Sequence, residues 1–410
     1  MLSGLLLCWQ HLTAQPAQPL AGTGFSPQRL ARLDSLLQGW IDDGMAPHIV
    51  AYVAQHGQVV HHRAYGYRDL AARTPLRQDD IFRIASQTKA IVTVGLLMLY
   101  EEGRCLLDDP VANYLPAFAH TQVLAGHDQD RYWTRPPKRP ITIRHLLTHT
   151  AGIPYDHPLD GMLGLNIPQV YANHDSIPLD TAVARIARRP LLHDPGEAFT
   201  YGLNTDVIGY LIEVLSGQPL DVYLRTRIFE SLDMKDTYFY LPPAKHSRLV
   251  ELYAKPSVDA PLVRSADDDM RSFATNPAGV YFSGGGGLVG TVGDYAHFCQ
   301  MLLDGGTYGG HRLLGRKTVD LMFRNQIGDL RVWDRQDGFG LGLQIVSPET
   351  RYAELATPGS GTWGGMYCSE YTIDRAEGLV MIVYTNVYPY AHYGEFVRKF
   401  RVAVYQALGE

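Results

Sequence analysis

The pattern of apolar and polar residues predicts a helix near each end of the chain. Between Pro27 and Gly44, apolar side chains recur every three or four residues, as they do on one face of an amphipathic helix. Proline suits the first turn of a helix, and glycine suits its end. Residues 396–404 show the same spacing. Each helix therefore presents one apolar face for packing.

Short runs of strand-forming residues accompany these two helices. Residues 48–55 and 59–65 are separated by a brief turn and predict a β-hairpin. Residues 366–374 and 378–386 predict a second pair of strands near the other end of the chain. Because both ends supply strands, we expect a single antiparallel sheet that is assembled from both.

The middle of the chain carries mainly helical patterns. Residues 86–102 are apolar nearly all round, which predicts a helix buried in the core. Residues 141–148 and 205–216 predict further helices, with proline-rich loops between them. The predicted fold class is therefore α/β (α+β), a central antiparallel sheet flanked by helices with a mainly helical domain inserted.

The length of the chain fits this organisation. A chain of 410 residues suits one large domain or two interleaved ones. We assign residues 25–105 and 275–410 to the sheet domain and residues 105–275 to the inserted helical domain. The active site is expected between the two.

Composition excludes several classes of protein. With 46% hydrophobic residues and a net charge of −6, from 36 Lys+Arg against 42 Asp+Glu, the chain is neither disordered nor a dedicated nucleic-acid binder. Its four cysteines form no C-x-x-C pair, so neither a zinc ribbon nor a disulfide framework is expected. They are Cys8, Cys105, Cys299 and Cys368.

The first residues resemble a secretory leader. An apolar stretch from Leu2 to Leu12 precedes small and polar residues, which predicts a signal peptide over residues 1–20 and a periplasmic or secreted protein. The alternative is a frayed N-terminal extension on a cytoplasmic protein. No later stretch has about 18 uninterrupted apolar residues, so no stable membrane span is expected.

Ser86-Gln87-Thr88-Lys89 is the only S-x-x-K pattern in the chain. Residues three apart on a helix share one face, so the Lys89 amine can reach the Ser86 hydroxyl. Serine is a poor nucleophile until a base takes its proton, and a buried lysine whose pKa is lowered can be that base. The alternative is a helix-capping serine beside a lysine that extends to solvent. A lysine that begins an otherwise apolar helix is costly if it is buried without a task.

The residues around Ser86 resemble those of the serine β-lactamase and penicillin-binding-protein superfamily. The similarity is greatest to the class C β-lactamases and the β-lactamase-like esterases (family VIII carboxylesterases). Four segments match in order, which is far more specific than any one motif. They are residues 82–89, 141–152, 195–201 and 283–289.

The resemblance implies a tyrosine that acts with Ser86 and Lys89. Tyr171-Ala172-Asn173 and Tyr384-Thr385-Asn386 match the family's Y-x-N pattern by letters. We nevertheless choose Tyr201, because it follows Pro-Gly-Glu-Ala-Phe-Thr and precedes a predicted helix start, as in the esterase branch. Tyr384 is expected in the core, and Tyr171 is expected to line the pocket. In this interpretation Tyr201 relays a proton to the leaving group.

Trp363-Gly364-Gly365-Met366 resembles the W-G-G form of the family's third motif. The two glycines let substrate approach the backbone, and the N–H of Met366 is expected to form the oxyanion hole with that of Ser86. A lysine in place of Trp363 would supply positive charge for the carboxylate of a β-lactam. Trp363 cannot, which favours an esterase over a penicillinase.

The remaining motifs do not indicate another chemistry. His145 and His149 have the spacing of half a zinc site, but the central glutamate and a third ligand are missing. The glycine run at residues 283–287 lacks the P-loop pattern and predicts a tight turn near the site. We therefore expect neither a metal nor a cofactor.

The sequence thus predicts a serine hydrolase that cleaves carboxylic esters through an acyl-enzyme on Ser86, with Lys89 and Tyr201 as base and proton shuttle. The expected partner is a small-molecule ester or amide. One alternative is a β-lactamase or D-amino-acid peptidase on the same scaffold. Another is a non-catalytic protein that retains the fold of a penicillin-binding protein.

Overall fold

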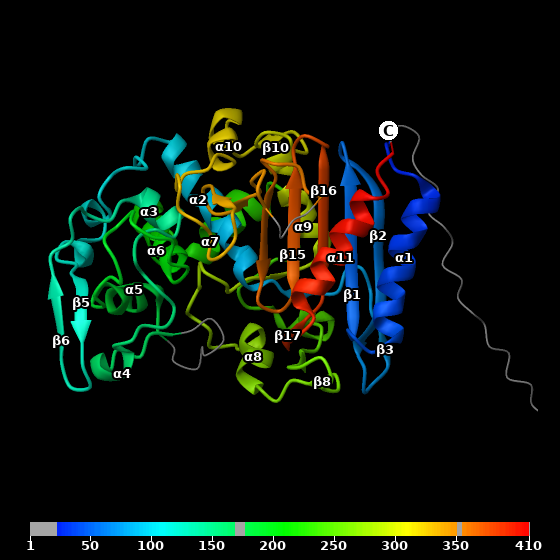
Figure 1. The fold of residues 1–410 in the computed structure, drawn as a ribbon, viewed down its shortest axis with the longest axis horizontal. Helices are drawn as coiled ribbons and strands as arrows, with labels where there is room; N and C mark the ends of the chain where they lie inside the picture. Colours follow the sequence, from blue (N-terminus) through cyan, green and yellow to red (C-terminus); the bar gives the residue numbers. More distant parts are fainter. Residues whose placement is uncertain (1–22, 169–176, 351–354, 410) are drawn as a thin grey trace, which may run out of the picture.

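An eight-stranded antiparallel sheet forms the centre of the protein (Figure 1). The structure is a computed structural model that describes residues 23–168, 177–350 and 355–409. The sheet order is β12-β13-β14-β15-β16-β1-β2-β3, which confirms that both ends of the chain build one sheet. In that order the strands span Gly338–Phe339, Gln344–Ile345, Gly361–Gly365, Ser369–Asp374, Leu379–Tyr384, His48–Gln55, Gln58–Asp69 and Thr74–Pro75.

Both faces of the central strands are covered. Met381 and Val383 of β16 pack with the helices α1 (Pro27–Asp42) and α11 (Tyr393–Tyr405), the two terminal helices that the sequence predicted. Their neighbours Val380 and Ile382 point into a second cluster with helices α2 (Thr88–Glu101) and α9 (Val292–Leu303). Burial on both faces explains why β16 is apolar at every position.

The segment between α2 and α9 lies mainly at the other end of the molecule (Figure 1). Besides its helices, it includes a hairpin and several short strands. The division into two domains stays a prediction. The helices of the segment between α2 and α9 are α3 (Ile143–Leu147), α4 (Asp160–Leu163), α5 (Leu179–Ala187), α6 (Asn204–Ser216), α7 (Leu220–Leu224) and α8 (Asp268–Ser272). Its strands are β5 (Val123–His127), β6 (Tyr132–Arg135), β7 (Tyr253–Lys255) and β8 (Val263–Arg264).

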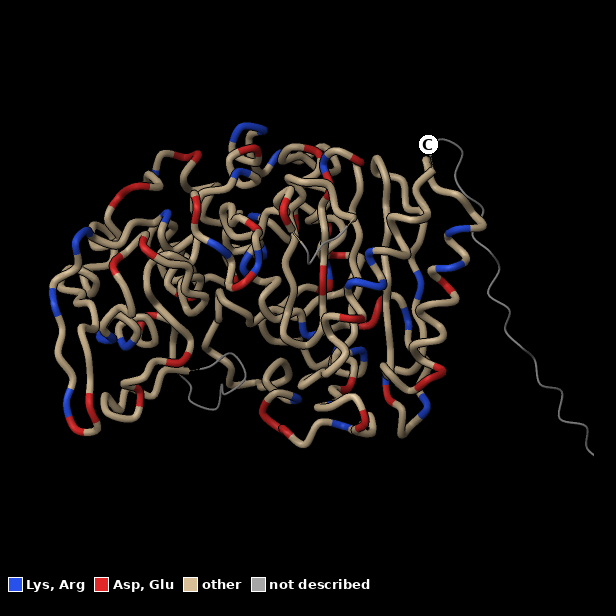
Figure 2. The backbone as a smooth tube through the Cα atoms, viewed as in Figure 1, with Lys and Arg blue, Asp and Glu red and all other residues tan. Residues whose placement is uncertain are grey.

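Short elements join these parts. Basic and acidic residues alternate along the backbone in both halves of the molecule (Figure 2). The remaining strands and α-helix are β4 (Phe82–Arg83), β9 (Val289–Gly290), β10 (Thr307–Tyr308), β11 (His311–Arg312), α10 (Arg316–Met322) and β17 (Val387–Tyr390).

The buried helix α2 begins later than predicted. Residues Ala85–Gln87 form a 3₁₀ turn, and the α-helix starts at Thr88. From Thr88 to Leu99 every side chain is buried. Among the described residues, no helix has both the length and the apolar character that crossing a bilayer requires. The predicted leader, with Cys8, lies outside the described residues.

His48, at the start of β1, links the two ends of the chain. Its Nδ1 lies 3.0 Å from the carbonyl oxygen of Tyr67, and its Nε2 accepts a hydrogen bond from the backbone N–H of Asn386 at 3.2 Å. A protonated ring could not accept the second bond. Burial lowers the pKa of His48 from 6.5 to about 4.

We therefore expect His48 to make the protein less stable in mild acid. Between pH 6.5 and 4 the unfolded chain binds a proton at this position and the folded chain does not. Its contribution to the free energy of unfolding should fall by about 1.4 kcal/mol per pH unit as the pH is lowered through this range. Urea unfolding at several pH values measures the slope.

His48→Gln should reduce that slope by about 1.4 kcal/mol per pH unit relative to the wild type, which corresponds to the uptake of one proton. His120→Gln, at an exposed position, is the matched control and should keep the wild-type slope. Equal slopes for the wild type and His48→Gln would contradict the assignment.

Candidate active site

The backbone around Ser86 is held in a strained turn. Ala85 has φ +44°, a left-handed conformation that is unfavourable for a residue with a side chain. The preceding strand is anchored to the end of the chain, because the Asn386 side chain accepts from Arg83 N at 3.0 Å and donates to Arg83 O at 3.2 Å. This anchoring fixes the backbone on which the Ser86 side chain is oriented.

The structure brings Ser86 and Lys89 together. Lys89 Nζ lies 3.2 Å from Ser86 Oγ, 2.7 Å from Tyr155 Oη and 2.5 Å from the carbonyl oxygen of Gly285. The lysine side chain is only 2% exposed. The alternative of a lysine that extends to solvent is therefore wrong.

These three contacts define what the amine can do. A carbonyl oxygen only accepts, so Lys89 must donate to Gly285 in either protonation state. The hydroxyls of Ser86 and Tyr155 can both donate and accept. A neutral Lys89 can therefore accept a proton from Ser86, and a charged Lys89 keeps all three contacts as donor.

A buried carboxyl group holds the glycine turn in place. Asp206 accepts hydrogen bonds from Ser283 Oγ at 2.7 Å, from Tyr281 Oη at 3.0 Å and from Gly285 N at 3.3 Å. A Cβ on Gly285 would lie 2.4 Å from Asp206 Oδ2. Burial raises the pKa of Asp206 above its ordinary value, and the nearby charge of Lys89 offsets only part of this increase. The glycine run is thus a turn that aims one carbonyl at Lys89.

Tyr155 is a site residue that the sequence analysis missed. It follows the recognised segment 141–152 by three residues, and this position was the available signal. Burial raises the pKa of Tyr155 well above 10, Tyr201 and Asp206 add to the effect, and the Ser86 hydroxyl opposes it. The phenol therefore keeps its proton at neutral pH.

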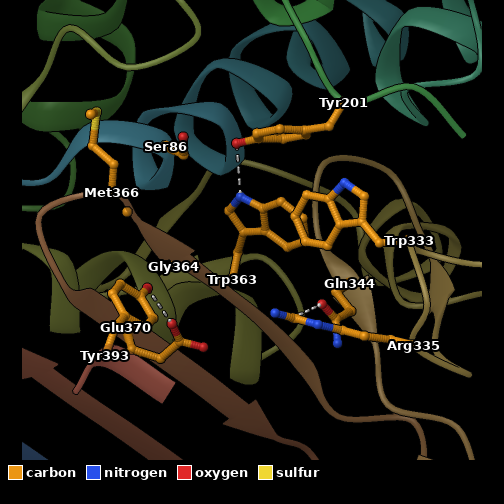
Figure 3. A pocket seen from close by; sticks show the side chains of 11 residues that line it. Ser86, Tyr201, Trp333, Arg335, Gln344, Trp363, Gly364, Met366, Glu370 and Tyr393 are labelled. Atoms are coloured by element: carbon orange, nitrogen blue, oxygen red, sulfur yellow. Dashed lines mark hydrogen bonds between the residues drawn. The ribbon is translucent and has the colours of Figure 1, made fainter. Parts of the chain in front are cut away.

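Tyr201 also lies in the site, but its hydroxyl has a different partner. The Tyr201 ring lies below Lys89 Nζ, at 4.6 Å from its centroid. Its hydroxyl accepts a hydrogen bond from Trp363 Nε1 at 3.2 Å (Figure 3). Trp363 therefore directs the Tyr201 hydroxyl, while Tyr155 contacts the lysine amine.

The two glycines of the W-G-G segment lie in β14, where the backbone is tightly packed. A Cβ on Gly365 would lie 2.3 Å from the carbonyl oxygen of Ile84, directly before the strained turn. A Cβ on Gly364 would lie 2.2 Å from both Glu370 Oε2 and Tyr393 Oη. Gly365 thus lets β14 approach the turn of Ser86, and Gly364 leaves room for the side chains of Glu370 and Tyr393.

Ser86 opens into a cavity of about 250 Å³ that Tyr201, Trp363, Gly364, Gly365 and Met366 also line (Figure 3). The structure thus gathers the predicted site residues that it describes, whereas Tyr171 lies outside the described residues. Sequence reasoning did not identify five further lining residues, because their segments match none of the recognised motifs. They are Trp333, Arg335, Gln344, Glu370 and Tyr393.

The two histidines with metal-like spacing have structural partners. His145 Nδ1 accepts a hydrogen bond from the backbone N–H of Thr142 at 3.1 Å and caps helix α3. His149 Nδ1 lies 2.9 Å from the side-chain amide of Asn204. Burial, together with the charge of Lys89, lowers the pKa of His149 well below 6.5.

Comparisons with known proteins identify the family of the chain. The family model "Beta-lactamase" matches residues 36–406. Esterase EstB of Burkholderia gladioli is 30% identical over 96% of this chain and 100% of its own. Lovastatin esterase of Penicillium rubens is 30% identical over 85% of this chain and 90% of its own. The structure of EstCE1, a hydrolase with promiscuous acyltransferase activity, is 28% identical, with a TM-score of 0.77 over 92% of this chain and 99% of its own.

The predicted fold class and the predicted enzyme class are therefore confirmed. The chain belongs to the β-lactamase family and is a β-lactamase-like serine hydrolase.

Proposed function

We propose that the protein is a carboxylesterase that works through an acyl-enzyme on Ser86. The observation that carries the proposal is the 3.2 Å contact between Ser86 Oγ and the buried amine of Lys89, at the edge of a cavity lined by Trp363. The relatives named as esterases support ester substrates.

Acylation begins when neutral Lys89 takes the proton of Ser86 and the oxygen attacks the ester carbonyl. The resulting ammonium keeps its contacts with Gly285 O and Tyr155 Oη, so the charge forms where acceptors already lie. The backbone N–H groups of Ser86 and Met366 are proposed to bind the oxyanion, because both residues border the cavity. Water then hydrolyses the acyl-enzyme.

The two tyrosines are proposed to have different roles in the reaction. Tyr155 contacts Lys89 at 2.7 Å and is placed to hold the amine in position. Tyr201 borders the cavity, with its hydroxyl oriented by Trp363, and is proposed to protonate the departing alkoxide. The Lys89 ammonium, whose Nζ lies 4.6 Å from the centre of the Tyr201 ring, is proposed to return the proton taken from Ser86 to the resulting phenolate. Ser86, Lys89 and Tyr201 thus keep the roles that the resemblance implied, with Tyr155 added.

We expect Ser86→Ala to abolish hydrolysis of p-nitrophenyl butyrate and the acyl adduct seen by intact-mass spectrometry, because the nucleophilic oxygen is removed. Lys89→Ala should lower the acylation rate by about 10²–10⁴-fold while the circular dichroism spectrum is retained. Full activity in either variant would contradict the mechanism.

The wild type should hydrolyse p-nitrophenyl butyrate much faster than a chromogenic cephalosporin. The reverse order would favour the β-lactamase alternative. Failure of a fluorophosphonate probe to label the wild type would favour the non-catalytic one.

We expect Tyr201→Phe to slow hydrolysis of ethyl butyrate far more than that of p-nitrophenyl butyrate. Ethoxide needs a proton to leave, whereas p-nitrophenolate does not, so loss of the proton donor should cost about 10²–10⁴-fold only for the ethyl ester. Steady-state kcat/KM for both esters measures the difference.

Tyr155→Phe should instead slow both esters, because it disturbs the amine that activates Ser86. Tyr238→Phe is the matched control, since its hydroxyl donates to Lys235 O near the surface. If Tyr201→Phe slowed both esters equally, Tyr201 would have no specific role in protonating the leaving group.

A further inference from the structure

Trp333 is a large apolar side chain that the protein keeps half outside its core. The indole is 49% exposed, and its backbone has φ +54°, a left-handed conformation in which a bulky residue is strained. The preceding Val332 is fully buried, and its carbonyl oxygen accepts a hydrogen bond from the backbone N–H of Arg335 at 3.0 Å. A buried anchor and a closed turn thus hold the indole at a defined place.

Trp333 extends the aromatic lining of the cavity into which Ser86 opens. Its ring stacks on Trp363 at a centroid distance of 5.5 Å and an angle of 24°, and it meets Tyr201 edge-on at 5.5 Å and 76°. The rings of Trp363 and Tyr201 are 5.2 Å apart. We call Tyr201, Trp333 and Trp363 the aromatic wall. All three residues line the cavity, so an occupant contacts ring atoms on this side.

Further rings support the aromatic wall from the core. Phe339, which is 1% exposed, contacts Trp363 at a centroid distance of 5.4 Å. Phe199 packs on Phe339 at 5.3 Å and on Trp333 at 5.9 Å. Core packing therefore positions the aromatic wall before any ligand arrives.

The aromatic wall lies on the side of the site from which the alcohol is proposed to leave. Tyr201, the proposed proton donor to the departing alkoxide, is part of this wall. A proton donor must lie within hydrogen-bond reach of the oxygen that it protonates, so the alcohol portion of a bound ester lies next to Tyr201. Figure 3 shows Trp333 beside Tyr201, whereas Met366 lies on the opposite side of Ser86. A group that extends from the alkoxide oxygen along the aromatic wall therefore reaches Trp333.

An aromatic ring gains more from this wall than a saturated ring of the same size. Both rings are removed from water, so the hydrophobic contribution is similar for the two. Only the aromatic ring also makes the offset-stacked or edge-to-face contacts that aromatic pairs favour beyond the area that they bury.

We propose that Trp333 is a specificity-determining residue that binds the alcohol portion of the substrate and favours an aromatic ring there over a saturated one. This inference rests on the proposed esterase function and names its substrate class. Binding of the alcohol gives a role to an indole that is neither buried in the core nor part of the W-G-G segment.

The test compares esters that differ only in whether one ring is aromatic or saturated. On the alcohol side the pair is benzyl butyrate and cyclohexylmethyl butyrate. On the acyl side the pair is ethyl phenylacetate and ethyl cyclohexylacetate. The readout is the ratio of kcat/KM for the aromatic to the saturated member, in which general effects of a substitution on catalysis cancel. Trp333→Leu should lower the alcohol-side ratio by about two- to tenfold and leave the acyl-side ratio unchanged.

Trp133→Leu is the matched control, because Trp133 is 52% exposed and lies in strand β6, outside the cavity lining. It should keep both wild-type ratios, and Trp333→Phe should recover part of the alcohol-side ratio. An unchanged alcohol-side ratio in Trp333→Leu would overturn the inference while ester hydrolysis itself stands. An equal fall in both ratios would overturn the assignment of Trp333 to the alcohol portion.

A binding measurement covers the case in which no ester is hydrolysed and the proposed function fails. Calorimetric titration of Ser86→Ala with N-benzylbutyramide and N-(cyclohexylmethyl)butyramide, which replace the ester by a stable amide, gives the ratio of the two Kd values. Adding Trp333→Leu should shift this ratio by about two- to tenfold against the benzyl compound. The same ratio with and without Trp333→Leu would overturn the subsite independently of catalysis.

Discussion

The site depends on keeping the amine of Lys89 buried and fully partnered. An amine that is 2% exposed has lost its water, so protein atoms must supply its hydrogen bonds. The Gly285 carbonyl, the Tyr155 hydroxyl and the Ser86 hydroxyl do so from three separate segments. Asp206 in turn holds the Gly285 turn. Ser86, the proposed nucleophile, is one of the three partners of the amine, so the packing that stabilises the lysine also positions the serine.

The large sheet brings these segments to one place. Strand β14 approaches the turn of Ser86 so closely that Gly365 cannot carry a side chain. On the other side of that turn, Asn386 anchors Arg83 through two hydrogen bonds. Segments from the far end of the chain therefore keep Ala85 in its strained conformation. The geometry of the site depends on the sheet as a whole.

The elements with strong periodicity were predictable, and the residues in loops were not. The hairpin of β1 and β2, the buried helix α2 and the terminal helices follow from apolar spacing alone. Ser86 and Lys89 could be paired because one helical turn separates them. Tyr155 was missed, since its contact with Lys89 joins residues 66 positions apart, and no single helix or strand contains both residues to fix the distance between them. Arg335 was missed because only the folded loop shows that it faces the cavity. Tyr201 was placed by the resemblance, but the partner of its hydroxyl could not be read from spacing.

The link between His48 and Asn386 has a consequence for synthesis on the ribosome. These residues are 338 positions apart, and β16, the partner of β1, ends two residues before Asn386. During translation, one edge of β1 stays unpaired until most of the polypeptide, including β16, has been synthesised. An unpaired edge can associate with other nascent chains. The order of synthesis thus makes the early hairpin a segment that benefits from chaperone protection.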